Sequence, residues 1–398
     1  MRTSQGVELA DIFRQHGAAY RSTHALPLNH LRVMRAVEVC RTATLGGHKD
    51  RCDSCGHIEI SYNSCRNRHC PKCQILQKEK WIEARNEELL PIQYFHVVFT
   101  IPSQLNPLVI MNQKVMYDLM FRSVSETLVE LSDNPKHLGA RIGFMSVLHT
   151  WGQNLMNHPH IHCVVTGGGL SLDGDRWVSC RKRFFIPVRV MSALFRGKLL
   201  AYLKSTFESG DPIFPGGIVH LRESHVFERF RKQLYHKKWV VYCKPPFDGA
   251  KGVLQYLGRY THRIAISNNR ILTADNDTVT FRWRDYADGN KQKTMTLKVD
   301  EFIRRYLLHV LPDRYVRIRH FGLLANRGRK DNITLCWELL GTSAVIEPDK
   351  IKKETWQEQL LRICGIDVTA CPVCQKGRMS RVDELLPSRC HSQPDQCQ

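Results

Sequence analysis

The chain has 398 residues, 42% of them hydrophobic and 24% charged, a globular composition that argues against a mainly disordered chain. Its 58 Lys and Arg against 38 Asp and Glu give a net charge of +20, which favours a polyanionic partner because cations placed on phosphates release condensed counterions. The apolar stretches fall far short of the roughly 18 residues of a membrane span, and the first thirty residues lack a secretory signal, so we expect a cytoplasmic protein without membrane contact.

The N-terminal part of the chain is predicted to be helical and then rich in cysteine. Apolar residues recur at helical spacing on both sides of Pro27, which predicts two helices within residues 1–45. Cysteines crowd the next stretch, and a charged helix over residues 75–90 ends before Pro91. We therefore expect a helical segment at 1–45 and a zinc-binding domain at 46–90.

The residue pattern changes from helical to mixed after residue 91. Aromatic and β-branched runs predict strands, and a longer apolar pattern predicts a helix over residues 109–131. The expected strands are 94–101, 141–150, 160–166 ending at the Gly167–Gly169 turn, a strand from Trp239, 263–267, and a hairpin of 279–283 with 293–299; a second helix is expected at 248–261. This mixture predicts an α+β fold, with a catalytic domain at 91–345 and a cysteine-containing tail at 346–398.

Two Cys-x-x-Cys segments, Cys52 with Cys55 and Cys70 with Cys73, carry the strongest metal signal. Four thiolates from two such turns make a tetrahedral zinc site, and the polar surroundings argue against a core of buried thiols. We predict a zinc-ribbon-like module with one structural Zn²⁺ at these residues. Further groups left open as a second zinc site or as phosphate contacts are Cys40, His48, Cys65 and His69.

A third Cys-x-x-Cys segment, Cys371 with Cys374, forms only half a site. Its possible completers in the C-terminal tail are Cys364, Cys390, His391 and Cys397.

A histidine-bearing strand is the second chemical signal. Side chains alternate across a strand, so His160 and His162 point to the same side, about 6 to 7 Å apart, and can share a divalent ion. Gln153, seven residues before His160, is the favoured third ligand, with His149 and His158 as rivals. The alternative is that the histidines have only a structural role.

Tyr256 and Tyr260 form the third signal, since residues four apart lie on one face of a predicted helix. Arg259 and Arg263 place positive charge beside them. The two phenols either pack in the core or act as nucleophiles that form phosphotyrosine with DNA, a reaction that needs no nucleotide cofactor. The chain has no Gly-x-x-x-x-Gly-Lys-Ser/Thr phosphate loop, which is consistent with the second interpretation.

A basic stretch from Arg304 to Lys330 holds eight Lys and Arg against one acid, Asp313, with Tyr306, Tyr315 and Phe321 among them. Basic residues interleaved with aromatics are typical of single-strand binding, and the arginine fork suits phosphates. The predicted DNA-binding residues are Arg259, Arg263, Arg317, Arg319, Arg327 and Arg329.

Taken together, the HPHIH strand and the later YLGRY resemble the HUH nucleases. The cysteine window and the run RIRHFGLLANR, from Arg317 to Arg327, resemble more closely the rolling-circle, two-tyrosine transposases of the IS ninety-one family of bacterial insertion sequences. This resemblance covers about Gly46 to Lys330. It implies an HUH-nuclease-like antiparallel sheet with flanking helices, metal on His160 and His162, and paired nucleophiles at Tyr256 and Tyr260.

The resemblance also implies a reaction and its partners. Single-stranded DNA at element ends and target would be cleaved and rejoined through a 5′-phosphotyrosine, assisted by Mg²⁺ or Mn²⁺, in a nucleoid-associated bacterial enzyme. The family has no helicase domain, so host replication or helicase factors would unwind the DNA. Two alternatives remain open: a relaxase or replication initiator with the same nuclease core, and a non-catalytic zinc-ribbon DNA-binding protein.

Overall fold

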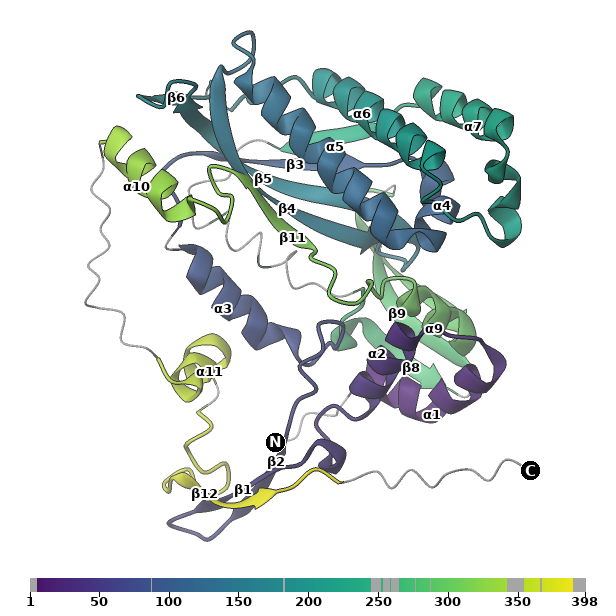
Figure 1. Cartoon of the computed structure of the whole chain (residues 1–398). Helices are drawn as coiled ribbons and strands as arrows, with labels where there is room; N and C mark the ends of the chain where they lie inside the picture. The colour runs from purple at the N-terminus through teal and green to yellow at the C-terminus, as the bar shows by residue number, and fades with distance from the viewer. Residues whose placement is uncertain are drawn as a thin grey trace. The chain divides into compact units, whose positions relative to one another are not determined.

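The computed structural model describes residues 6–388, apart from residues 87, 182, 245–251, 253–257, 259–264, 276, 287, 342–353 and 366. The chain forms two compact units, which we call the terminal unit and the central unit (Figure 1). The terminal unit comprises Met1–Lys80, His262–Arg304 and Ile346–Gln398, and the central unit comprises Trp81–Thr261 and Arg305–Val345. These boundaries differ from the predicted domains at 1–45, 46–90, 91–345 and 346–398, because strand pairing joins segments that are distant in the sequence.

The terminal unit begins with the two predicted helices, α1 (Leu9–Thr23) and α2 (Leu28–Glu38). Pro27 lies at the N-cap of α2, which confirms that it separates them. The apolar side chains that defined the helical spacing are the buried ones, among them Phe13 and Met34. Each helix therefore buries one apolar face, as its sequence pattern requires.

Two three-stranded antiparallel sheets complete the terminal unit. The first has the order β12-β1-β2, with β1 at Gly47–Cys52, β2 at Ile58–Tyr62 and β12 at Met379–Leu385. Since β12 pairs with β1, the region predicted as a C-terminal tail is part of the N-terminal sheet (Figure 1).

The second sheet, of order β10-β9-β8, contains the predicted hairpin. Gly289 and Asn290 have the positive φ angles that its turn requires, +60° and +63°. The elements of this region and its neighbours are β8 (Ile271–Asp275), β9 (Thr278–Asp285), β10 (Lys291–Lys298), α9 (Val299–Leu307), α11 (Trp356–Cys364) and the short 3₁₀ helices η1 (Ala43–Leu45) and η4 (Asn268–Arg270).

The central unit is built on an antiparallel sheet of order β11-β4-β5-β3-β7, with β6 also paired to β5. Together with its helices, it confirms the α+β fold class. The strands are β3 (Tyr94–Thr100), β4 (Ala140–Trp151), β5 (Asn157–Ser171), β6 (Trp177–Ser179), β7 (Val240–Lys244) and β11 (Ile318–Gly322). Residues 263 and 264 of the predicted strand at 263–267 lie outside the described residues, and the described residues 265–267 form no strand. The helix predicted at 248–261 lies largely outside the described residues.

Strand β5 is longer than predicted, because the Gly167–Gly169 run continues it instead of ending it. A side chain at Gly167 would collide with Gln93, and one at Gly169 would collide with the backbone of Arg141. The glycines therefore mark close approach of neighbouring backbone within the sheet, and the predicted turn is wrong.

Helices cover one face of this sheet. They are α4 (Asn106–Met111), α5 (Gln113–Asp133), α6 (Val188–Glu208) and α7 (Ser224–His236), while α3 (Gln74–Asn86), α10 (Arg329–Leu339), η2 (Ser103–Leu105) and η3 (Gly216–Arg222) complete the list. The single helix predicted at 109–131 is interrupted at Asn112. The side chain of Asn112 donates to the Ile213 carbonyl (2.9 Å) and accepts from the Ile213 N–H (2.8 Å), which holds the chain in a non-helical conformation there.

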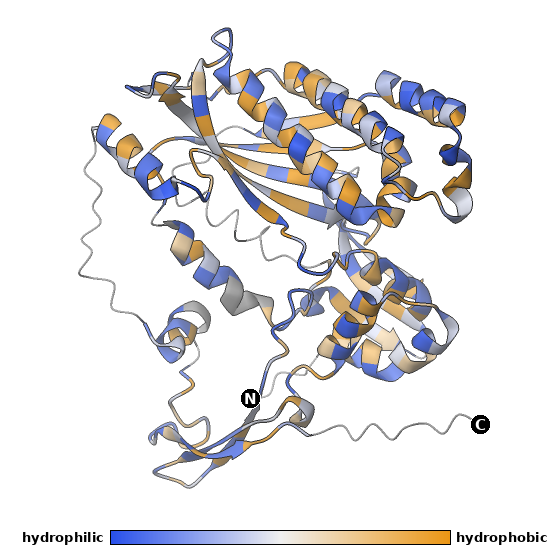
Figure 2. Ribbon diagram, viewed as in Figure 1, coloured by the Kyte–Doolittle hydropathy of each residue, from blue (hydrophilic) through white to orange (hydrophobic). Residues whose placement is uncertain are grey.

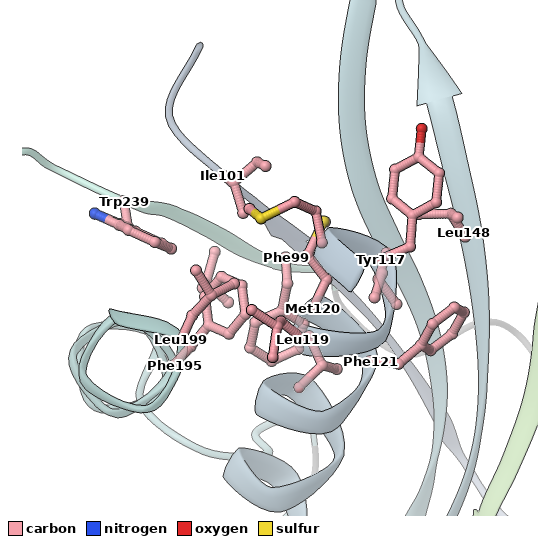
Figure 3. Close-up of a cluster of buried hydrophobic side chains, with 14 of the residues drawn as sticks. Phe99, Ile101, Tyr117, Leu119, Met120, Phe121, Leu148, Phe195, Leu199 and Trp239 are labelled. Atoms are coloured by element: carbon pink, nitrogen blue, oxygen red, sulfur yellow. The ribbon is translucent and has the colours of Figure 1, made fainter. Parts of the chain in front are cut away.

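The main core lies between the sheet and these helices. Phe99 of β3, Leu148 of β4 and Phe195 of α6 are fully or almost fully buried in it (Figure 3). Figure 2 shows hydrophobic residues along β4 and β5, whereas β1 and β12 carry mostly hydrophilic ones. Alternation along β3, β4 and β5 sends every second side chain into this core, and the intervening side chains to the opposite face of the sheet.

Candidate metal and DNA-processing site

Four histidines lie on the face of the central sheet opposite the helices. His160 pairs across the strands with His149 of β4, and His162 lies two residues further along β5. His96 of β3 shares that face, since it pairs with Val164. The neighbouring residues Phe95 and Ile161 point into the helix-covered core. Because apolar and histidine residues alternate along these strands, one face of the sheet forms the core and the other carries the candidate site.

His149, His160 and His162 converge. Their ligand nitrogens all lie within 4.8 Å of one another, and the ring centroids are 4.5 Å apart for His149 and His162 and 4.8 Å apart for His160 and His162. His149 and His162 are buried and His160 is half-buried. Three convergent imidazoles in a largely dry position can hold one divalent ion.

Backbone contact fixes the ring of His160. Its Nδ1 lies 2.6 Å from the carbonyl oxygen of His158. A carbonyl can only accept, so Nδ1 carries the proton and donates, and Nε2 holds the lone pair. This tautomer is the one found in metal-binding histidines, whose second nitrogen donates to a carbonyl or carboxylate.

His162 is oriented by another histidine. The Nε2 of His96 lies 2.8 Å from the Nδ1 of His162, and the two rings stack with an interplanar angle of 8°. Burial, together with the charges of Lys244 and His160, lowers the pKa of His96 to about 3. His96 is therefore neutral near pH 7 and can accept a hydrogen bond from His162, which leaves Nε2 of His162 as the metal-facing nitrogen.

The structure brings His160 and His162 together, as the alternation predicted, and adds His149 from the three third-ligand candidates. Gln153 lies in the turn between β4 and β5, and its role as a ligand stays a prediction. Sequence reasoning missed His96 altogether. Its signal was the strand YFHVVFTI itself, where a lone histidine interrupts an otherwise apolar run.

The cysteines are arranged differently from the prediction. Cys52, Cys55, Cys70 and Cys73 do not form one cluster. Cys70 and Cys73 lie with Cys40 and Cys65, whereas Cys52 and Cys55 lie with Cys371 and Cys374. The predicted four-thiolate set is therefore wrong, because the β2 strand separates its two Cys-x-x-Cys segments and each finds other partners.

The cluster of Cys40, Cys65, Cys70 and Cys73 has the donor set and spacing of a zinc site. The Sγ atom of Cys73 lies 3.5 Å from that of Cys40 and 3.6 Å from that of Cys65. Four sulfurs placed about 2.3 Å from a central Zn²⁺ in a tetrahedron are about 3.8 Å apart, close to these separations. Cys40 and Cys65 were left open as second-site ligands, whereas His48, another candidate, pairs with Asp50 (3.2 Å).

Comparisons with known proteins agree with this geometry. A family model described as "Transposase zinc-binding domain" matches residues 12–101, and one described as "Putative transposase" matches residues 143–332. The chain is 48% identical over 379 residues to "Putative transposase y4qJ" of Sinorhizobium fredii, with 95% of each chain covered. It is 30% identical over 338 residues to "Transposase for insertion sequence element IS801" of Pseudomonas savastanoi pv. phaseolicola, covering 84% of this chain and 79% of that one.

The chain belongs to the IS ninety-one family of transposases. The cluster of Cys40, Cys65, Cys70 and Cys73 lies within the zinc-binding match, and His149, His160 and His162 lie within the second match. No solved structure matches the chain. Among the described residues of the transposase, no helix is both long and apolar enough to cross a bilayer.

The two predicted nucleophiles of the transposase, Tyr256 and Tyr260, lie outside the described residues, as do Arg259 and Arg263. Their roles stay predictions. They fall within residues 143–332, the match to the second family model.

The basic stretch of the transposase divides into two kinds of arginine. Arg319 donates to Asp118 (2.5 Å), and its guanidinium lies 4.2 Å from the ring centroid of Phe121, so it fastens β11 to α5. Arg329 pairs with Glu88 at 3.4 Å. Both arginines therefore have a role in holding the fold, and DNA contact by them stays a prediction. Arg327 is exposed and Arg317 is half-buried, and DNA contact by these two stays a prediction.

Proposed function

We propose that this transposase cleaves and rejoins single-stranded DNA through a 5′-phosphotyrosine intermediate, in rolling-circle transposition. The observation that carries the proposal is the convergence of His149, His160 and His162 on one sheet face. Membership of the transposase family supports DNA as the substrate. The net charge of +20 suits the phosphate backbone.

The proposed reaction is a redox-neutral exchange of phosphate esters. The phenolic oxygen of Tyr256 or Tyr260 attacks a phosphorus atom of DNA, and the bond from phosphorus to the 3′ oxygen breaks. The tyrosine loses its proton, the 3′ oxygen gains one, and the 5′ phosphate stays esterified to the protein. Attack by a 3′ hydroxyl reverses the step and rejoins DNA, so no nucleotide cofactor is consumed.

His149, His160 and His162 would hold the divalent ion, with Gln153 as a candidate oxygen ligand. A bound Mg²⁺ or Mn²⁺ supplies Lewis-acid polarisation of the scissile phosphate. Three imidazoles are a nitrogen-rich donor set, which suits Mn²⁺ better than the oxygen-preferring Mg²⁺. We therefore expect Mn²⁺ to support cleavage at lower concentration than Mg²⁺. Host replication or helicase factors would supply single strands, and the enzyme would associate with the nucleoid.

The experiment incubates the full chain with single-stranded oligonucleotides that carry the ends of its insertion sequence, in Mn²⁺. We expect a protein–DNA adduct that survives denaturation and that carries a label placed at the 3′ end of the oligonucleotide, because the protein is joined to the 5′ phosphate of the downstream fragment. Tyr256→Phe combined with Tyr260→Phe should abolish the adduct and spare DNA binding. Tyr235→Phe is the matched control, because Tyr235 is an exposed tyrosine on α7, the helix side of the sheet, and should change nothing.

Two outcomes separate the alternatives. Intact binding without an adduct on any end sequence would leave a non-catalytic zinc-binding DNA protein. Adduct formation on a plasmid origin or transfer origin, and not on element ends, would indicate a replication initiator or relaxase.

A further inference from the structure

A second group of four cysteines brings together an N-terminal and a C-terminal segment of the chain. The Sγ atoms of Cys55 and Cys371 are 3.7 Å apart although 316 residues separate them in sequence, and those of Cys52 and Cys374 are also 3.7 Å apart. All four ligand atoms lie within 4.8 Å of one another. These separations match the roughly 3.8 Å edge of a zinc–thiolate tetrahedron.

The two Cys-x-x-Cys segments have the same backbone turn. In the first, the N–H of Gly56 donates to the carbonyl of Cys52 (3.1 Å), and in the second, the N–H of Gln375 donates to the carbonyl of Cys371 (3.0 Å). Gly56 and Gln375 also share a positive φ, +70° and +56°. A left-handed glutamine is unusual, so its conformation is explained by the need to form the same metal-binding turn.

The two turns can approach each other closely because residue 377 is a glycine. A side chain there would collide with the Sγ of Cys52, and also with Asp53 and Ser54. The contact is fixed from both sides, because Asp53 donates its N–H to the carbonyl of Arg378 (3.1 Å) and accepts the N–H of Arg378 on Oδ1 (2.8 Å). The two turns therefore fit each other as a matched pair.

Strand β12 buries little apolar surface. It pairs with β1, from Cys52 opposite Met379 to Gly47 opposite Leu385, but five of its seven residues are exposed. Burial of apolar surface therefore cannot hold this strand, and one exposed ion pair, Lys49 with Asp383, contributes little. Metal binding at the cysteines would add the free energy of attachment that apolar burial does not supply.

We propose that Cys52, Cys55, Cys371 and Cys374 bind a second zinc ion, which fastens the C-terminal segment to the N-terminal sheet of the terminal unit. The zinc-binding family match ends at residue 101, well before Cys371, so this site goes beyond what the family model covers. The site makes β12 part of the zinc module. Because the site closes a loop of about 316 residues, its loss frees the C-terminal segment from the terminal unit.

The test measures the number of zinc ions per chain by elemental mass spectrometry. The full protein carries His160→Ala and His162→Ala, so that the histidine cluster adds no zinc. We expect two zinc ions. Cys371→Ser with Cys374→Ser should remove one, Cys52→Ser should remove the same one, and combining them should remove no more. Cys65→Ser should remove the other ion, additively with either change.

The matched control is Cys390→Ser with Cys397→Ser, which changes two C-terminal cysteines outside the proposed site and should leave two zinc ions. A second measurement needs no variant of the site. Iodoacetamide should label Cys52, Cys55, Cys371 and Cys374 together, and only after a chelator removes zinc. Unchanged zinc in the Cys371→Ser, Cys374→Ser protein would overturn the proposal, as would labelling of Cys371 at the rate of Cys390 in the zinc-loaded protein. A disulfide at these positions, seen as thiols missing from the chelated, unreduced protein, would also overturn it.

Discussion

At the residue scale, the buried His96 orients His162, a candidate metal ligand. The 2.8 Å contact between their nitrogens fixes which nitrogen of His162 is available to a metal ion. Replacing a residue that orients a metal ligand in this way usually weakens metal binding by about 10- to 100-fold. We expect His96→Leu to raise the Kd for Mn²⁺ by that factor, measured by calorimetric titration of the folded protein.

His158→Ala is the control for this prediction. Its carbonyl, rather than its ring, accepts the hydrogen bond from His160, so removing the ring should leave Mn²⁺ affinity nearly unchanged. A His96→Leu protein that is folded and binds Mn²⁺ as tightly as the wild type would show that His96 only fills space.

The same residues show how far sequence reasoning reaches. His160 and His162 could be paired from alternation alone, because that period is local. His149 and His96 enter the site through strand register, which places His149 opposite His160 and which no local pattern specifies. The cysteines follow the same rule: the Cys-x-x-Cys segments are local signals, whereas the choice of Cys371 as a partner for Cys55 depends on the tertiary fold.

At the scale of elements, the turn between β4 and β5 is held by a buried histidine. The Nε2 of His309 lies 3.0 Å from the carbonyl of Leu155, and its Nδ1 lies 3.2 Å from the hydroxyl of Thr150. Leu155 has a φ of +62°, so the turn needs this support. Since the turn joins the two strands that carry the metal ligands, its stability bears on the site.

Burial lowers the pKa of His309 to about 4, from about 6.5 in an unfolded chain. Below pH 6.5 the imidazole of His309 is therefore protonated in the unfolded state, whereas in the folded state it stays neutral until the pH reaches about 4. The stability from this residue is complete above pH 6.5 and is lost as the pH falls towards 4, by up to about 3 kcal/mol. We expect His309→Gln, which cannot titrate, to lose less stability over this range than the wild type.

The measurement is urea unfolding of both proteins at several pH values between 7 and 4. The buried His96 and the half-buried His320 also have lowered pKa values and contribute equally to both proteins, so the difference isolates His309. Parallel pH profiles would show that His309 does not titrate as the burial of its ring requires.

Elements with strong local patterns were predicted well, and their ends less so. The two N-terminal helices, strand β3 and the β9–β10 hairpin are confirmed, since Pro27, the β-branched run and the Asp-Gly-Asn turn act locally. The glycines of β5 and the break at Asn112 were missed. In both places a contact with a residue distant in sequence determines the local structure. The backbone of Arg141 packs against Gly169, and the backbone of Ile213 is hydrogen-bonded to Asn112.

At the scale of the whole molecule, contiguous segmentation fails because the terminal unit is assembled from three separate stretches. The chain leaves this unit near residue 80, forms the central sheet, returns for the β8–β10 sheet, and returns again to add β12. The last return is fixed by the pairing of β12 with β1, residues far apart in the sequence, whereas β8, β9 and β10 pair with one another. Changes in composition along a chain show where the type of structure changes. They cannot show which distant segments pack into the same unit.

Net charge is the one whole-molecule property that the sequence gives outright, and it supports a quantitative prediction. With a charge of +20, affinity for single-stranded DNA should fall steeply with salt, by a slope of about −0.7 per phosphate contacted in a plot of log affinity against log salt. Arg327 and Lys330 are exposed, unlike the ion-paired Arg319. We expect Arg327→Ala with Lys330→Ala to weaken binding to every sequence alike and to make the slope shallower by about 1.4.

The charge-matched control is Lys232→Ala with Lys237→Ala, which removes two exposed cations at α7, on the helix-covered side of the sheet. Fluorescence anisotropy at several salt concentrations measures both slopes with one labelled oligonucleotide. If general charge attraction alone holds the DNA, the two double variants will lose affinity equally and keep the wild-type slope. If Arg327 and Lys330 each neutralise a phosphate, only their variant will show the shallower slope, because counterions are released at the phosphates that the protein contacts.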